Sequence, residues 1–246
     1  MSSVTKAFQI LETVADAGER GLPFARIVDT TGIPKASAHR LLKELAELAV
    51  LNYDPDTRHY RGGMVLARLG ASASADYDLR RVARPHLEAL QKETGHVATL
   101  GVRNDDEGVY VEKIEPDDFS IRLHSEVGKA FPLHSTGMGK VLLAHASIED
   151  VRRLSKRRLQ AYTKHTITDS KALRQELERI REQGYALDRE EITRGLMCVA
   201  APIYDAHGEI AGAISCTFQS YINADRGIDA EIDAVMRHAK AASGLI

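Results

Sequence analysis

The alternation of apolar and polar residues over the first 62 positions predicts three short helices followed by a hairpin. In each helix the apolar residues recur every three or four positions, which places them on one face. These faces are Val4, Phe8, Leu11 and Val14 in the first helix, Phe24, Ile27 and Val28 in the second, and Leu41, Leu42, Leu45 and Leu48 in the third. A Gly-Ile-Pro turn separates the last two helices, and a DPDT turn joins two strand-like pieces. This order of elements predicts a winged helix-turn-helix.

The pattern differs after residue 95, where short apolar stretches separated by polar turns predict strands. Before it, we expect a linker helix over residues 63–80 and a helix break at Arg84–Pro85, because proline lacks the amide that a helix interior needs. Strands are predicted at 96–103, 108–115, 120–127, 198–205 and 210–218, and helices at 137–146, 148–155, 170–183 and 226–242. The prediction is an α+β chain with a DNA-binding domain over 1–62 and a second domain over 81–246 built on a mostly antiparallel sheet.

Composition narrows the class of protein. A hydrophobic content of 43% suffices for packed cores, and a net charge of −2 means that any basic site is local. Two cysteines are too few for a disulfide framework and suit a reducing compartment. No apolar run approaches the roughly 20 residues that span a bilayer, and polar residues rather than a signal peptide follow Met1. We therefore expect a cytoplasmic globular protein with no membrane partner.

The third predicted helix and the hairpin carry the residues expected to bind DNA. A recognition helix presents the side chains of its first turns to base edges and phosphates in the major groove. Residues 1–62 hold eight Lys and Arg but also eight Asp and Glu, so a positive surface depends on arrangement. The candidates are Lys35, Ser37, His39 and Arg40 on the helix, with Arg58, His59 and Arg61 on the hairpin.

A stronger basic run lies in the second half, in the segment VRRLSKRRLQ. On a helix, Arg152, Arg153, Lys156 and Arg157 share one side while Val151 and Leu154 face inward. Such a run is usually a solvated helix face, so it is not interpreted as a DNA-binding surface.

The stretch FPLHSTGMGKVL predicts an open helix start. Ser135 or Thr136 can cap a helix that begins near Gly137, and Gly137 and Gly139 leave its first amides uncovered. Unpaired amides and the positive end of the helix dipole favour a carboxylate or a phosphate. The glycine spacing does not match a phosphate-binding P-loop, so nucleotide binding is not expected.

The last two predicted strands supply further candidates for a small-molecule site. A period of two in IAGAISCTF places Ala211, Ala213, Ser215 and Thr217 on one face, and Ile210, Ile214, Cys216 and Phe218 on the other. One face is apolar, whereas the other is small and bears hydroxyls. Asp188 and Cys198 lie where a loop enters the preceding strand. These residue types suit a pocket for a small polar molecule.

Taken together, these segments resemble the IclR family of bacterial transcriptional regulators over nearly the whole chain. The motifs are TTGIPKASAHRLLKEL, PLHSTGMGKVLLA and the long stretch from Tyr162 to Ser215. The resemblance implies a winged helix for DNA and a C-terminal domain, akin to GAF and PAS folds, that binds a small organic acid. It also implies a homodimer, since the family commonly forms dimers that pair further into tetramers. A two-fold dimer would place two recognition helices in successive major grooves of a pseudo-palindromic operator. We expect no cofactor. The residues that it assigns to the effector are Gly137, Met138, Asp188, Cys198, Ser215 and Thr217.

Three positions depart from the family pattern: Ser135 replaces a common Ala, Thr217 a common Ser, and Met138 a smaller residue. With few aromatic residues in reach, a small aliphatic acid is favoured over a stacked planar ligand. The competing hypothesis is an enzyme with Cys198 as nucleophile and His134 or His165 as base, but no motif provides the required pairing. We expect no catalytic and no metal site.

Overall fold

The computed structural model describes residues 2–75, 78–116, 125–221 and 227–245. The chain divides into two compact units, Met1–Tyr77 and Asp78–Ile246. Each unit has a hydrophobic core of its own. The predicted third strand over 120–127 falls mostly outside the described residues.

The N-terminal unit contains the predicted three helices and hairpin. Its elements are α1 (Ser3–Asp16), a 3-10 turn (Gly18–Arg20), β1 (Leu22–Pro23), α2 (Phe24–Thr31), α3 (Lys35–Glu47), β2 (Leu51–Asp54), β3 (His59–Gly62) and α4 (Met64–Ala75). The Ser2 hydroxyl accepts the amide hydrogen of Thr5 and caps α1. The sheet has the order β1-β3-β2, so the short β1, which the sequence did not predict, adds a third strand to the hairpin.

The buried faces of α1 and α3 differ in part from the prediction. In α1, Ile10 and Val14 are fully buried, whereas Val4 and Phe8 are 67% and 61% exposed. In α3 the buried face consists of Ala38, Leu41, Leu42 and Leu45. The helix ends at Glu47, and Leu48, which follows it, is exposed. Helical spacing identifies sets of neighbours but cannot tell which of two overlapping sets meets the core.

The C-terminal unit alternates helices with the strands of one sheet. Its elements are α5 (Asp78–Thr94), β4 (Val97–Asn104), β5 (Glu107–Ile114), β6 (Ala130–Pro132), α6 (Gly137–Ala144), α7 (Ile148–Ser155), α8 (Ser170–Gln183), β7 (Ala186–Arg189), β8 (Leu196–Tyr204), β9 (Ile210–Gln219) and α9 (Asp229–Ala242). The strand order is β6-β5-β4-β9-β8-β7 and every pair is antiparallel. The predicted α+β class is therefore confirmed.

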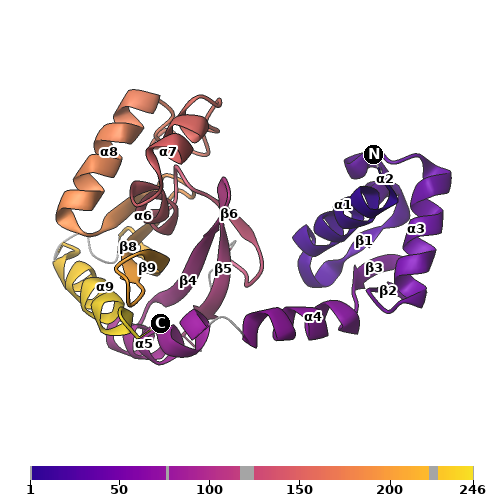
Figure 1. The fold of residues 1–246 in the computed structure, drawn as a ribbon, viewed down its shortest axis with the longest axis horizontal. Coiled ribbons are helices and arrows are strands. Elements are labelled where there is room, and N and C mark those ends of the chain that lie inside the picture. Colours follow the sequence, from indigo (N-terminus) through magenta and orange to yellow (C-terminus); the bar gives the residue numbers. More distant parts are fainter. Residues whose placement is uncertain (1, 76–77, 117–124, 222–226, 246) are drawn as a thin grey trace. The chain divides into compact units, whose positions relative to one another are not determined.

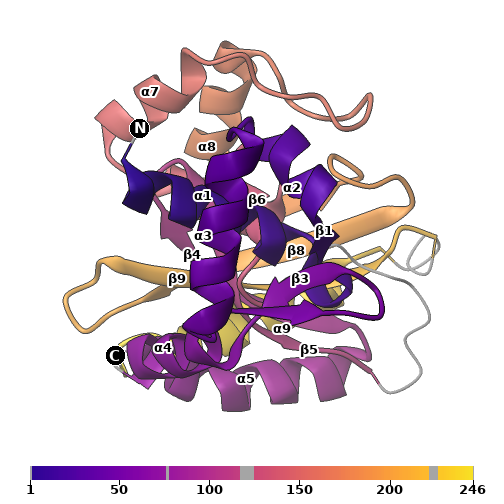
Figure 2. The same cartoon turned by 90° about the vertical axis from the view of Figure 1, so that its right-hand side faces the viewer.

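Helices cover both faces of this sheet, and Figures 1 and 2 show the layers from two sides. Helices α5 and α9 pack on one face, where Leu87, Ile214 and Phe218 belong to one core. Helix α6 packs on the other face, with α7 and α8 outside it. All eight residues of α6 are buried, so this helix is enclosed between the sheet and the outer helices.

Pro85 does not break the helix, contrary to the prediction. Helix α5 runs without interruption from Asp78 to Thr94 and includes this proline. Proline has the φ value of a helix, and its penalty of about 3 kcal/mol comes mainly from the missing hydrogen bond and a clash. Burial of Leu79, Leu87 and Leu90 against the sheet offsets that penalty.

Two bulges shift the alternation of side chains along the sheet. The register of β8 with β9 shifts near Ala211. Ala211 consequently packs in the core on the α5 and α9 side and Ile210 in the core on the α6 side, which reverses the predicted faces. The register of β4 with β5 slips at Val111. Tyr110 therefore faces the α6 side, whereas Glu112 faces α5 and binds Arg80.

The corrected face of α1 generates a stability prediction. Ile10→Ala should lower the free energy of unfolding of the N-terminal unit by about 2–5 kcal/mol, because it leaves a cavity in the core. Phe8→Ala, on the same helix, should change it by less than about 0.5 kcal/mol. Urea unfolding followed by circular dichroism measures both. A larger loss for Phe8→Ala than for Ile10→Ala would contradict the observed packing.

Candidate functional site

The start of α6 is an open helix terminus capped by Thr136. The Thr136 hydroxyl accepts the Gly139 amide hydrogen at 3.0 Å, and the Thr136 carbonyl accepts that of Lys140 at 2.9 Å. The amides of Gly137 and Met138 come first in the helix and have no acceptor within it. Of the two caps that the sequence left open, the structure selects Thr136.

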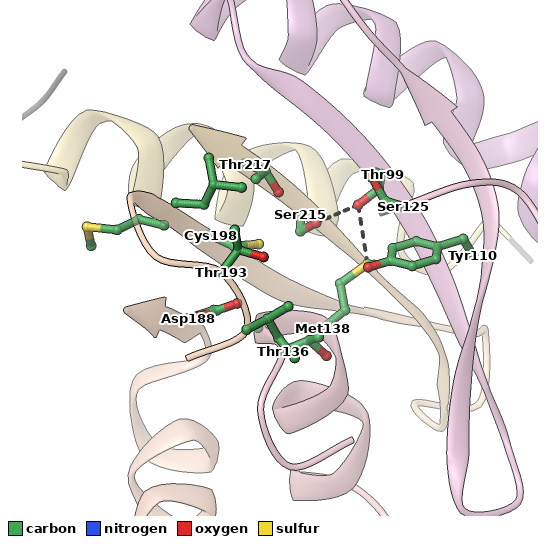
Figure 3. Close-up of a pocket in the computed structure, with 14 residues that line it drawn as sticks. Thr99, Tyr110, Ser125, Thr136, Met138, Asp188, Thr193, Cys198, Ser215 and Thr217 are labelled. Carbon is green, nitrogen blue, oxygen red and sulfur yellow. Dashed lines mark hydrogen bonds between the residues drawn. The ribbon is translucent and has the colours of Figure 1, made fainter. Parts of the chain in front are cut away.

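Gly137 and Met138 line a cavity of about 80 Å³ between α6, the sheet and the β7–β8 loop (Figure 3). The structure brings all six of the predicted effector residues into its wall. The lining consists of Thr99, Tyr110, Ser125, Thr136, Gly137, Met138, Asp188, Ile192, Thr193, Leu196, Met197, Cys198, Ser215 and Thr217.

Sequence reasoning missed the contributions of β4 and β5 to this wall. Thr99 faces the cavity because it pairs with Ser215 across the β4–β9 ladder. Tyr110 reaches it because of the bulge at Val111. Alternation along the predicted strand indicates that Thr99 faces the interior. The order of the strands and the bulge cannot be read from the sequence, so no sequence signal placed Thr99 and Tyr110 beside Ser215.

The hydroxyls of Thr99 and Ser215 lie 2.6 Å apart and hydrogen-bond to each other. Thr99 also donates to the sulfur of Met138, with 3.7 Å between Oγ1 and Sδ. Ser125 Oγ, by contrast, is buried without a hydrogen-bond partner among the described residues. A buried hydroxyl without a partner is uncommon in proteins.

Asp188 contributes a carboxyl that is 9% exposed at the opposite end of the cavity from Ser125 (Figure 3). Its Oδ1 accepts the Glu191 amide hydrogen at 2.7 Å. Burial raises the pKa of the Asp188 carboxyl to about 7, and the nearby Glu191 carboxylate acts in the same direction. Near neutral pH this carboxyl therefore exists in both protonation states.

Lys140 holds the β7–β8 loop from beneath. Its ammonium is 1% exposed, donates to the Leu187 carbonyl at 2.6 Å and forms an ion pair with Glu191. Glu176 of α8 lies 3.8 Å away. The loop that carries Ile192 and Thr193 into the cavity is thus anchored to α6 by a buried ion pair, whose loss would leave an uncompensated charge.

Cys198 does not have the surroundings of a nucleophile. Burial raises the pKa of its thiol to about 11, and the Asp188 carboxylate adds to the effect, so the thiol stays protonated. No histidine lines the described cavity; His134 hydrogen-bonds to the Gln160 carbonyl, and His165 is exposed. Among the described residues, no three His, Cys, Asp or Glu side chains gather as metal ligands would.

The predicted DNA-binding residues of α3 lie on its solvent side. Lys35, His39 and Arg40 are exposed and Ser37 is half-buried. Arg40 forms an exposed 4.0 Å ion pair with Glu44, a contact of little energetic weight. His39 packs edge-on against Phe24, with 6.1 Å between ring centroids. Lys35 and Arg40 are therefore the side chains of this set that are freest to meet an approaching phosphate.

The hairpin residues differ in how they are held. Arg58 is exposed in a left-handed turn conformation with φ of 56°. His59 and Arg61 are half-buried, and Arg61 lies 3.4 Å from the Asp54 carboxylate. The predicted basic tip is present, but part of its charge is neutralised within the hairpin.

Two of the four residues in the basic run near α7 are paired within the C-terminal unit. Arg153 and Arg157 both contact Asp106, at 2.8 and 2.6 Å. Val151 and Leu154 are buried, as predicted, and Arg152 is exposed. These pairs agree with the interpretation of a solvated structural face.

A winged helix-turn-helix joined to a sheet domain with a small cavity is the architecture of ligand-binding transcriptional regulators. Residues 3–55 match the IclR helix-turn-helix domain, and residues 71–244 match the family described as Bacterial transcriptional regulator IclR C-terminal. The chain belongs to the IclR family. Membership of this family makes the chain a transcriptional regulator with a helix-turn-helix domain, and its curated relatives are likewise named as transcriptional regulators.

Individual relatives agree over almost the full length. The chain is 36% identical to the HTH-type transcriptional regulator BhcR of Paracoccus denitrificans (strain Pd 1222) over 98% of this chain and 86% of that protein. It superposes on an IclR transcriptional regulator from Alicyclobacillus acidocaldarius with a TM-score of 0.85 at 28% identity, covering 98% and 97% of the chains. An IclR homologue from Microbacterium hydrocarbonoxydans, solved with 4-hydroxybenzoate, gives 0.85 at 25% identity, with 98% of both chains covered. None of the described helices is long and apolar enough to cross a membrane.

The buried Asp188 carboxyl generates a pH prediction. Its pKa rises from an ordinary 3.8 to about 7 on folding, so the folded chain holds more protons than the unfolded chain between these values. The contribution of this group to stability is therefore complete below pH 4 and is lost as pH rises to 7. Asp188→Asn keeps the shape and should gain stability over the native chain between pH 5 and 8, by at most about 4 kcal/mol. Urea unfolding of both proteins at pH 5 and at pH 8 measures this difference in the free energy of unfolding. Equal pH dependence in the two proteins would exclude the assigned shift.

Proposed function

We propose that the chain is a cytoplasmic regulator of a catabolic operon whose effector is a small aliphatic acid bound in the cavity at the start of α6. The observation that carries the proposal is that two helix amides without an acceptor in the helix, those of Gly137 and Met138, border the same cavity as buried hydroxyls from β9 and β4. Helix amides of this kind bind carboxylates.

The size of the cavity supports a small ligand. At about 80 Å³ it exceeds several-fold the roughly 10–15 Å³ that one water needs. That corresponds to an oxo- or hydroxy-acid of about two to five carbons. A ring acid is larger.

The two ends of the cavity suit the two ends of such an acid. The carboxylate would accept hydrogen bonds from Gly137 and Met138, where the helix dipole favours negative charge. The oxo or hydroxyl end would meet the groups around Asp188 and Thr217. Because Asp188 titrates near pH 7, it can donate a hydrogen bond when protonated instead of repelling the acid.

The relative solved with 4-hydroxybenzoate supports a carboxylate-bearing effector. The cavity of this chain favours a smaller member of that chemical class. The change in DNA affinity would come from a difference in effector affinity between two states of the protein, since equal affinity for both shifts nothing.

On the DNA side, we propose that a homodimer, alone or paired into a tetramer, binds a pseudo-palindromic operator. Two-fold symmetry would place one α3 in each of two successive major grooves. Lys35, Ser37, His39 and Arg40 would contact bases and phosphates, and Arg58, His59 and Arg61 the adjacent backbone. The exposure of Lys35, Arg40 and Arg58 supports this assignment.

One experiment separates the two activities. DNA affinity is measured by fluorescence anisotropy on a duplex that the protein selects from a random pool, with and without 2-oxo and 2-hydroxy acids. Arg40→Ala should weaken DNA binding by about 1–3 kcal/mol, roughly five- to 150-fold, with thermal stabilisation by the acid unchanged. Asp188→Ala combined with Ser215→Ala should bind DNA normally and lose the response to the acid.

Arg152→Ala is the matched control, because it removes an exposed arginine from the basic run near α7. It should leave both activities intact. Unchanged DNA affinity in Arg40→Ala would contradict the placement of the recognition surface, and an unchanged acid response in the double variant would contradict the assigned cavity.

A further inference from the structure

Met138 is the one long flexible side chain that α6 sends into the cavity. It is 3% exposed, and its sulfur lies 3.7 Å from Thr99 Oγ1 on β4. Its terminal methyl lies close to the backbone of β4, since a Cβ added to Gly101 would stand 3.2 Å from it. The side chain therefore crosses the space between the helix start and the sheet.

Tyr110 lies at the far end of this side chain. Figure 3 shows its hydroxyl directed toward Met138 and Thr99, on the side of the cavity away from Asp188. Met138 thus lies between the aromatic wall, formed by Tyr110 and the Phe131 ring behind it, and the part of the cavity lined by Asp188, Cys198 and Thr217.

The aromatic wall itself has little freedom to move. The Tyr110 ring packs on Phe131, with 4.6 Å between ring centroids. Phe131 in turn fits against Gly101 and Gly108, where an added Cβ would stand 2.7 and 2.0 Å from its ring. Methionine has three rotatable bonds and fills irregular gaps, so it is the adjustable part of this region.

We propose that Met138 is the specificity-determining residue that restricts the cavity to small aliphatic acids, by filling the space that an aromatic ring would occupy beside Tyr110. This inference rests on the proposed function. Shortening Met138 removes three non-hydrogen atoms and widens the cavity beside Tyr110. A benzoate could then keep its carboxylate at the α6 amides, which are backbone groups, and place its ring against Tyr110.

The test compares the full-length native chain with Met138→Ala and Met138→Leu. Leucine keeps the volume of methionine and serves as the matched control. Thermal unfolding is followed with benzoate and with a panel of 2-oxo and 2-hydroxy acids of about two to five carbons. Should Met138→Ala not give a cooperative transition, Met138→Val makes the same comparison with less loss of volume.

The native chain and Met138→Leu should be stabilised by a small acid and not by benzoate. Met138→Ala should bind benzoate at least tenfold more tightly than the native chain does. If small acids stabilise the variants but truncation brings no gain for benzoate, or if the native chain already binds benzoate as well as the small acids, the role of Met138 is wrong. If neither class stabilises any of the proteins, the acid effector itself is wrong, and the role of Met138 falls with it.

Discussion

The C-terminal unit depends on one constraint, which is that the first amides of an enclosed helix have no acceptor within that helix. Helix α6 is buried along its whole length, and the cavity adjoins its first turn. Thr136 satisfies the amide of Gly139, whereas the amides of Gly137 and Met138 have no acceptor within the helix. The sheet supplies small and hydroxyl-bearing residues opposite, because larger side chains at Ser215 or Thr217 would fill the cavity. The fold thus maintains an unsatisfied helix start, which a bound acid would satisfy.

Buried charge surrounds this helix start and ties it to the loop that closes the cavity. Lys140 pairs with Glu191, and the Glu191 amide donates to Asp188. The buried ion pair therefore connects the β7–β8 loop to α6 by direct contact. Asp188 is kept in a place where its charge is unfavourable near neutral pH. That penalty is understandable if the same carboxyl hydrogen-bonds to the effector.

The sequence was sufficient where local pattern determines structure. The open start of α6 and the hydroxyl-bearing face at Ser215 and Thr217 were predictable from glycine spacing and from a period of two. Thr99 and Tyr110 were not, because their position depends on which strands pair and on a bulge, and both are properties of the folded sheet. The continuous path of α5 through Pro85 was missed for a related reason: packing against the sheet outweighs a local penalty. The same limit applies to Phe8, whose spacing suited a buried face that the core does not use.

The central claim is that the α6 amides bind a carboxylate, and amide chemical shifts test it at the atoms concerned. In a ¹⁵N-labelled full-length chain, titration with the small acid that stabilises it should move the resonances of Gly137 and Met138 more than those of other amides. The Gly139 amide, already bonded to Thr136, should move less. Shifts that leave Gly137 and Met138 in place while other residues respond would contradict the account.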